Sequence, residues 1–152
     1  MYVADIELHS CTTLDEASEL LRRLSPGARL LAGGTELLVD LKTGRSSAKH
    51  LVSLSGVEGL RGVSLTEDGL RIGALTTLSQ LDRSPVVREH FAAIRDATGQ
   101  MAAIQIRNAA TVGGNVVCAV PCADLPPVFS VLDASVLAWS PSGERRIKLD
   151  SF

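Results

Sequence analysis

Strand-like and helix-like hydrophobic patterns alternate over the first third of the chain. Short apolar runs predict three strands, at residues 1–8, 29–32 and 49–54. Between the first two runs, apolar residues recur with helical period from Leu14 to Leu24, and Pro26 ends the pattern. A second helix is expected between the second and third strands. The resulting β-α-β-α-β order favours a small parallel sheet within residues 1–55.

Polar residues and glycines at the ends of these segments match helix caps. Thr13 precedes the first helix and Glu16 stands three residues later, which is the spacing of a capping box. Thr35 is expected to cap the second helix, with Glu36 in its first turn and Gly44 after its last turn. The apolar run that precedes Thr35 is expected to be a buried strand.

The pattern changes after a boundary near Gly56 and Gly59. A turn at residues 66–69 separates two strand-like runs and predicts a β-hairpin. The later elements are expected to be a short helix capped by Thr76 or Thr77, a helix at 84–97, a helical segment at 122–132 and a hairpin at 135–149. We therefore predict an α+β fold with one subdomain at residues 1–55 and a second at residues 56–152.

Two glycine pairs stand beside apolar runs in distant parts of the chain. The first lies in Ala32-Gly33-Gly34-Thr35-Glu36, and the second lies in Thr111-Val112-Gly113-Gly114-Asn115, before a strand-like Val116-Val117. A Gly-Gly step permits positive φ and removes the Cβ atoms that would block a ligand. Consecutive backbone N–H groups can then converge on an anion. Together the pairs suggest two loops around one diphosphate ligand.

Neither glycine pair matches a common nucleotide-binding motif. The Lys-Ser/Thr ending of a Walker loop and the dinucleotide pattern G-x-G-x-x-G are both absent. Alone, the first pair is also explained by a plain turn. Asp124 fits either a helix cap or an acceptor for a ribose or ribityl hydroxyl, and Arg107 fits a surface charge. No nucleophile–base pair is evident, so a cofactor must supply any catalytic chemistry.

Composition and charge narrow the function classes. The 152-residue chain is 45% hydrophobic and carries a formal net charge of −2. Its basic residues form no long run, which disfavours nucleic-acid binding, and 3% aromatic content disfavours a base-stacking surface. No apolar stretch is long enough to span a membrane, and no secretory signal is visible. A cytoplasmic location is therefore expected.

The cysteines and histidines do not predict a metal site. Cys118 and Cys122 lack the second pair that a zinc or iron–sulfur site requires. His9, His50 and His90 are far apart in the sequence and show no ligand spacing. They are expected to be solvated or structural.

Three motifs, taken together and in this order, resemble the FAD-binding subunit of molybdenum hydroxylases. They lie at residues 31–38, 106–115 and 121–127. That family includes the medium subunit of aerobic carbon monoxide dehydrogenase and the FAD domains of xanthine dehydrogenase and 4-hydroxybenzoyl-CoA reductase. The three cysteines of this chain cannot supply the extra iron–sulfur cluster of the reductase type, so that subtype is disfavoured.

The resemblance implies a flavin domain of the vanillyl-alcohol-oxidase type. In this fold, a small β/α subdomain and a larger subdomain with an antiparallel sheet hold FAD between them. The first glycine loop would bind the diphosphate through backbone amides. The FAD-binding residues implied for this chain are Leu31, Ala32, Gly33, Gly34, Thr35, Glu36, Leu37, Ala102, Ile106, Ala110, Thr111, Gly114, Asn115, Val117 and Asp124.

The resemblance also implies electron transfer within a complex. Substrate would be oxidised at the molybdopterin-bound molybdenum of a large subunit, and electrons would pass through [2Fe–2S] clusters of a small subunit to FAD. The final acceptor would be NAD, oxygen or a quinone. Family members continue past the equivalent of Phe152, so a C-terminally truncated domain is expected. A stand-alone flavin oxidoreductase and a non-catalytic scaffold subunit remain as alternatives.

Overall fold

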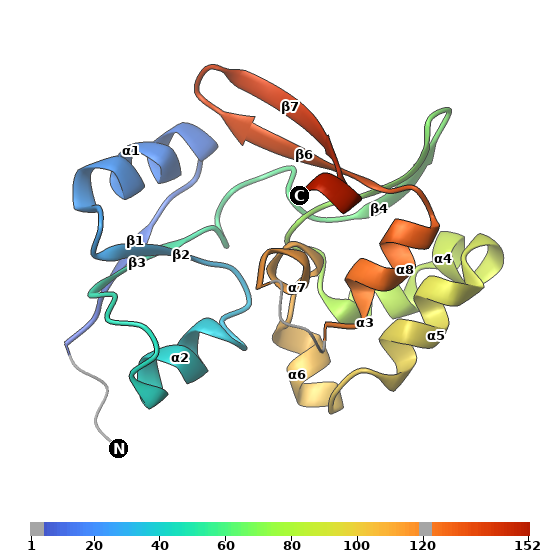
Figure 1. Ribbon diagram of the computed structural model, residues 1–152, viewed down its shortest axis with the longest axis horizontal. Coiled ribbons are helices and arrows are strands. Elements are labelled where there is room, and N and C mark those ends of the chain that lie inside the picture. Colours follow the sequence, from blue (N-terminus) through green and yellow to red (C-terminus); the bar gives the residue numbers. More distant parts are fainter. Residues whose placement is uncertain (1–4, 119–122) are drawn as a thin grey trace.

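The computed structural model describes residues 5–118 and 123–152 and has an α+β architecture (Figure 1). A small sheet with two helices occupies one side of the molecule, and a group of short helices occupies the other. The C-terminal hairpin extends from the helical side toward the first helix. No helix within the described residues is long and apolar enough to cross a membrane.

The small sheet has three parallel strands in the order β1-β3-β2. β1 (Glu7–Ser10) and β2 (Ala28–Leu31) each pair with the central β3 (His50–Ser53). α1 (Leu14–Leu24) and α2 (Leu37–Thr43) make the connections. The predicted parallel β-α-β-α-β unit is confirmed. The part of the predicted first strand at residues 1–4 lies outside the described residues.

The ends of these two helices confirm two expectations and correct a third. The Glu16 N–H donates to Thr13 Oγ1 at 3.1 Å, and the Glu16 carboxylate accepts the Thr13 N–H, so the capping box is confirmed. Gly44 ends α2 with a φ of 77°, as predicted. Thr35 does not cap α2. Glu36 holds the N-cap position, with helical backbone angles and no side-chain capping bond.

β2 is not the buried strand that its apolar sequence predicts. It lies at an edge of the sheet, and its Leu30 is 44% exposed. The central β3 is buried instead, with Val52 fully inaccessible. Hydrophobic periodicity identifies a strand but does not give its position within a sheet, which explains the error.

The second half of the chain combines two antiparallel hairpins with short helices. One hairpin pairs β4 (Val63–Thr66) with β5 (Gly69–Ile72), and the other pairs β6 (Ser135–Ser140) with β7 (Gly143–Lys148), so both predicted hairpins are confirmed. The helices are α3 (Leu78–Arg83), α4 (Pro85–His90), α5 (Ala92–Gln100), α6 (Ile104–Ala109), α7 (Val112–Cys118), α8 (Leu125–Val131) and a final 3₁₀ turn (Leu149–Ser151).

The helix predicted at residues 84–97 is divided at Phe91. This residue has a φ of −131° and a ψ of 62°, and it separates α4 from α5. The Phe91 N–H donates to the Val87 carbonyl, and the Phe91 carbonyl accepts the Ile94 N–H. The break allows Val87 and Ile94 to be buried in one core although their helices run in different directions. The apolar spacing continues across Phe91, so it does not predict the break.

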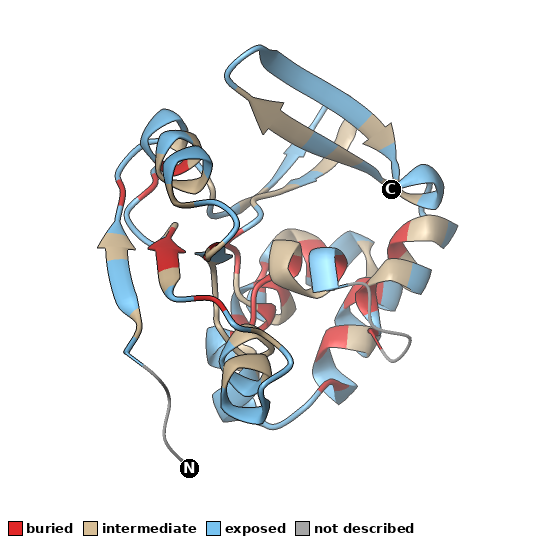
Figure 2. Ribbon diagram, turned by 60° about the vertical axis from the view of Figure 1, so that its left-hand side comes forward, coloured by how far each residue is buried: buried red, intermediate tan, exposed pale blue. Residues whose placement is uncertain are grey.

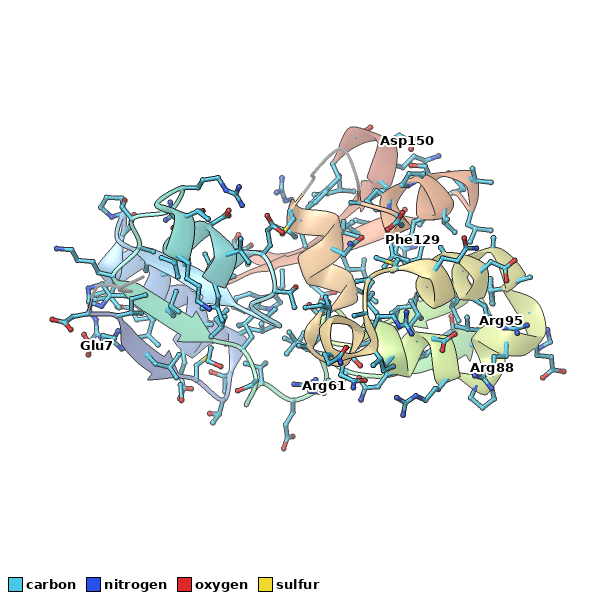
Figure 3. All side chains as sticks on the ribbon, turned by 90° about the horizontal axis from the view of Figure 1, so that it is seen from below. Glu7, Arg61, Arg88, Arg95, Phe129 and Asp150 are labelled. Carbon is cyan, nitrogen blue, oxygen red and sulfur yellow. The ribbon has the colours of Figure 1, made fainter. Side chains whose placement is uncertain are left out.

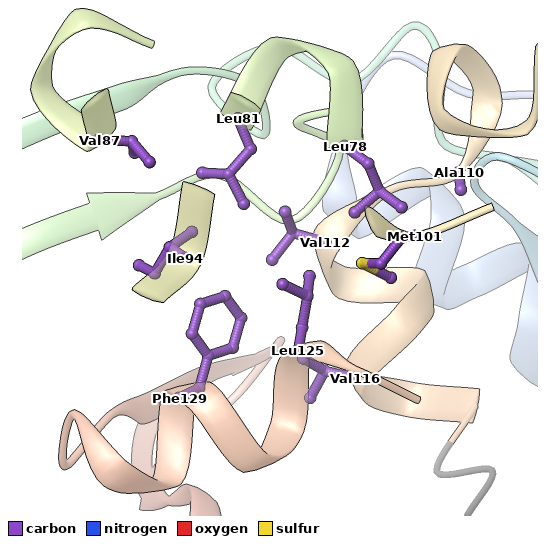
Figure 4. Packing of buried hydrophobic residues seen from close by; sticks show 10 residues of the cluster. All are labelled: Leu78, Leu81, Val87, Ile94, Met101, Ala110, Val112, Val116, Leu125 and Phe129. Carbon is purple, nitrogen blue, oxygen red and sulfur yellow. The ribbon is translucent and has the colours of Figure 1, made fainter. Parts of the chain in front are cut away.

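The main hydrophobic core lies among α3, α4, α5, α7 and α8 (Figure 4). Leu81 and Leu125 are fully inaccessible, and Phe129 points into the same cluster from α8. Buried residues are accordingly concentrated in the helical part of the chain (Figure 2). A second cluster beneath α1 includes Val52 and Val57. The boundary between residues 55 and 56 stays a prediction.

Candidate functional site

The first glycine pair lies in the turn that joins β2 to α2. Gly34 has a φ of +73°, a value that L residues rarely adopt, so the turn requires glycine at this position. The backbone N–H groups of residues 33–37 donate no hydrogen bond to any described residue. These residues are half-buried, not fully exposed. Consecutive unbonded N–H groups in a turn form a concave site suited to an anion.

Gly33 brings this turn into direct contact with the second motif. A Cβ atom at residue 33 would overlap the Ala109 carbonyl oxygen and would lie 3.1 Å from the Ala110 Cα. Ala109 ends α6, and Ala110 leads into α7. Figure 1 shows the turn after β2 pointing toward these two helices. The two glycine motifs, which are distant in sequence, therefore meet in space.

The second glycine pair does not form a second anion nest. Gly113 and Gly114 lie inside α7, so the strand-like interpretation of Val116-Val117 is wrong. The Gly113 N–H donates to the Ala74 carbonyl at 2.8 Å, and the Gly114 N–H donates to Thr111 Oγ1 at 3.1 Å. A Cβ atom at residue 113 would lie 2.8 Å from the Ala74 oxygen. Close packing, not free amides, explains this pair.

The polar side chains that flank the second pair differ in their hydrogen bonding. Thr111 is buried, and its hydroxyl oxygen accepts the Gly114 N–H in the geometry of a helix cap. Asn115 has a buried amide oxygen, Oδ1, without a hydrogen-bond partner among the described residues. A buried acceptor left unpaired costs about 1–3 kcal/mol. A donor from a ligand or from water would recover that free energy, so Asn115 Oδ1 is a candidate acceptor.

Four other predicted site residues, Ala102, Ile106, Val117 and Asp124, are exposed. Ile106 and Val117 are 44% and 67% exposed. Asp124 is exposed at the N-cap position of α8 and makes no side-chain capping bond. Ala102 is exposed and has a φ of 42°. Among the described residues, neither Ala102 nor Asp124 makes a hydrogen bond to the first glycine turn.

Arg107 has a positioning role that the sequence did not predict. Its Nη1 donates to the carbonyl oxygens of Gly99, Met101 and Ala102 at 3.2, 2.8 and 3.0 Å. These bonds tie the segment between α5 and α6 to α6 itself. The segment includes the positive φ of Ala102, which is unfavourable for a residue other than glycine. Arg107 is therefore more than a surface charge.

Carboxylates near the first turn influence the end of α7. Cys118 is an exposed residue, but partial burial of its thiol raises the thiol pKa, and the negative charges of Glu36 and Asp40 raise it further. Both carboxylates contact Arg45, whose Nε lies 2.6 Å from Asp40 Oδ1 and whose Nη2 lies 3.5 Å from Glu36 Oε1. Arg45 therefore offsets the repulsion that Glu36 would exert on an anion at the turn.

Two of the three histidines lie close together, a proximity that their spacing in the sequence does not show. His9 Nε2 lies 3.2 Å from His50 Nδ1, and the Glu7 carboxylate lies near both rings. Their strands pair in parallel although they are distant in sequence, so residue spacing alone did not reveal the cluster. His90 lies elsewhere, at the exposed end of α4.

Comparison with known proteins assigns the family. The family model described as "FAD binding domain in molybdopterin dehydrogenase" matches residues 4–152. A xanthine dehydrogenase FAD-binding subunit of Escherichia coli is 38% identical over 145 residues, covering 95% of this chain and 49% of the relative. The carbon monoxide dehydrogenase medium chain of Hydrogenophaga pseudoflava is 32% identical, covering 96% of this chain and 51% of the relative.

A solved structure supports the same assignment. Carbon monoxide dehydrogenase from Hydrogenophaga pseudoflava aligns with a TM-score of 0.95 and 31% identity, over 99% of this chain and 52% of that chain. The predicted fold class is confirmed by this similarity. The chain spans about half the length of the curated relatives it matches. On the family match, the chain belongs to the FAD-binding domains of molybdopterin dehydrogenases.

Proposed function

We propose that this chain binds FAD where its two glycine motifs meet, with the diphosphate at the turn between β2 and α2. The observation that carries this proposal is the run of unbonded N–H groups at residues 33–37. Such a run matches the acceptor oxygens of a diphosphate better than it matches a neutral ligand. Gly34 permits the backbone shape of the turn, and Gly33 permits its contact with Ala109.

The polar groups of the site fit a flavin dinucleotide. The first turn offers donors, whereas Asn115 Oδ1 offers an unpaired acceptor suited to a hydroxyl or N–H of the ligand. Asp124, which is exposed, provides a second acceptor for a ribose or ribityl hydroxyl. Ala102, Ile106 and Val117 supply apolar surface at the margin, and Leu31 and Leu37 flank the turn.

The residues of the second motif hold the site in shape as well as contacting the cofactor. Ala110 is buried behind Gly33, and Thr111 and Gly114 fix the start of α7. These contacts orient the Asn115 side chain on the same helix. When bound, FAD supplies the capacity to accept electrons and pass them to a final acceptor. The protein's part is to bind and orient the cofactor.

We further propose that the chain serves as the flavin-containing part of a molybdenum-dependent dehydrogenase. Electrons would come from a small [2Fe–2S] subunit, and the organic substrate would be oxidised on a large subunit that carries the molybdenum cofactor. The names of the relatives, xanthine dehydrogenase FAD-binding subunit and carbon monoxide dehydrogenase medium chain, support this role. We also propose a cytoplasmic location.

The decisive experiment is to identify the cofactor released from the purified native complex. Denaturation followed by chromatography and mass spectrometry should yield FAD in near-stoichiometric amount to this chain. Release of FMN alone, or of no flavin, would contradict the proposal. Anaerobic reduction by the complex's substrate should then bleach the flavin absorbance. Bleaching by a small substrate without the molybdenum subunit would instead favour a stand-alone oxidoreductase.

A further inference from the structure

We propose that Glu7, His9 and His50 form a binding site for a divalent transition-metal ion such as Zn²⁺. The site lies on the small parallel sheet and does not involve the glycine motifs. Figure 3 shows Glu7 at the end of the molecule that is remote from the short helices. The inference therefore stands independently of the proposed flavin function.

The parallel pairing of β1 with β3 assembles the three side chains. Glu7 is in register with His50, and His9 lies two residues beyond Glu7 on the same strand. Because side chains alternate between the two faces of a strand, Glu7 and His9 share one face. The same alternation continues to Cys11 and Val52, which pack in the cluster beneath α1. The three ligands thus belong to the face of the sheet that α1 covers.

The distances between the side chains fit coordination of one small ion. One ligand atom from each residue lies within 4.8 Å of the other two. His9 Nε2 is 3.2 Å from His50 Nδ1, and Glu7 Oε2 is 3.3 Å from His50 Nδ1 and 3.8 Å from His9 Nε2. Tetrahedral zinc bonds of about 2.0–2.1 Å place neighbouring ligand atoms roughly 3.3 Å apart. Only Glu7, with an exposed side chain, would need to move slightly.

The donor set has the chemistry of a transition-metal site. Two imidazole nitrogens and one carboxylate oxygen suit Zn²⁺ and other first-row divalent ions. Binding requires both facing nitrogens to be unprotonated, with the ring N–H groups at His9 Nδ1 and His50 Nε2. Cys11 is outside the set, because its Sγ donates to the Ser53 carbonyl at 3.0 Å. Three protein ligands leave one coordination position for water.

The position of the cluster indicates what a bound ion would do. β1 is an edge strand that pairs only with β3 among the described strands. An ion held by Glu7 and His9 on β1 and by His50 on β3 would fasten the two strands together. An ion that binds the folded chain and not the unfolded chain raises stability. The ion would therefore stabilise the pairing of the first strand with β3. The side chain of Glu7 is 66% exposed and that of His50 is 28% exposed, so the ion can reach the site from solvent.

The test is a titration of the chelator-treated, tag-free protein with ZnCl₂, measured by isothermal titration calorimetry. We expect one ion to bind each chain. In a separate thermal-unfolding measurement, we expect Zn²⁺ to raise the midpoint temperature of unfolding. His50→Ala and His9→Ala should each weaken binding by roughly tenfold or more and abolish the thermal shift. His90→Ala removes a histidine that lies outside the cluster and should change neither result. Titration with Co²⁺ should give a visible absorption spectrum that His50→Ala removes.

A more conservative substitution keeps the test informative if the histidine variants do not fold. Glu7→Gln changes only an exposed side chain at the edge of the sheet, so it should fold normally and still weaken Zn²⁺ binding. Circular dichroism establishes whether each variant is folded. The proposal would be overturned if the unmodified protein did not bind Zn²⁺ stoichiometrically. It would also be overturned if Glu7→Gln and either folded histidine variant both bound Zn²⁺ with unchanged affinity.

Discussion

Gly33 packs its α carbon against the carbonyl group of Ala109, with no room for a side chain between them. This contact joins the turn after β2 to the end of α6, and it is made by backbone on both sides. Neither partner can move away by a change of rotamer. The spacing of the two glycine motifs therefore depends on the absence of a Cβ atom at one position.

Gly33→Ala should damage both stability and cofactor binding. The added methyl would overlap the Ala109 oxygen, so the two motifs must separate. Overpacking of this kind costs about 1–3 kcal/mol or more in the free energy of unfolding. Urea denaturation and the flavin content of the purified protein would measure the two effects. Gly99→Ala is the matched control, because a Cβ at that helical residue meets nothing within 4 Å. It should be neutral or stabilising by up to about 1 kcal/mol.

Asn115→Ala should affect stability and flavin affinity in opposite directions. The substitution removes a buried oxygen that has no described partner, so the flavin-free protein should be equally stable or about 1 kcal/mol more stable. The variant should nevertheless bind FAD at least roughly tenfold more weakly, as expected for a lost hydrogen bond worth about 1.4 kcal/mol. Asn108→Ala, on the exposed surface of α6, controls for helix propensity. A marked loss of stability in flavin-free Asn115→Ala would mean that its oxygen is already satisfied.

Glu16 should contribute to the acid sensitivity of the fold. Hydrogen bonds from the Thr12 backbone, the Thr12 side chain and the Thr13 backbone lower the pKa of its carboxyl below the usual value of a glutamate. A group with a lowered pKa in the folded state stabilises the fold above its unfolded pKa, near about 4.3. That contribution disappears as the pH falls through the lowered folded value. Urea midpoints between neutral and acidic pH should therefore fall less in Glu16→Gln than in the unmodified protein. Glu58→Gln removes an exposed carboxylate outside this network and should not flatten the profile.

The sequence predicts local structure here better than it predicts contacts between elements. The capping box of Thr13 and the αL glycine at Gly44 depend on neighbouring residues, and both are confirmed. The exposure of β2 depends on which strand occupies the centre of the sheet, which local periodicity does not encode. Local periodicity also does not predict that His9 lies close to His50, because this proximity arises only when β1 pairs with β3.

For the candidate site, the sequence predicts the glycine motifs but not their separate roles. Both pairs have the composition of an anion-binding turn, yet only the first leaves its amides unbonded among the described residues. The amides of Gly113 and Gly114 are used by Ala74 and Thr111, and Ala74 lies far upstream in the chain. A sequence motif therefore indicates where glycine is required. The hydrogen bonds of the backbone N–H groups in the structure indicate whether glycine is required for binding a ligand or for close packing.

Cys118 offers a test of whether the charge of Glu36 in the first motif acts on the end of α7. Partial burial of the thiol and the charges of Glu36 and Asp40 together raise its pKa, so less of the reactive thiolate is present at neutral pH. Glu36→Gln should increase the rate of alkylation by iodoacetamide at pH 7–8, in a background where Cys11 and Cys122 are serine. Mass spectrometry would follow the modification. Asp82→Asn removes a carboxylate of α3 that does not act on this thiol, and it should leave the rate unchanged. Equal rates in Glu36→Gln and Asp82→Asn would show that the Glu36 charge does not raise the pKa of the Cys118 thiol in solution.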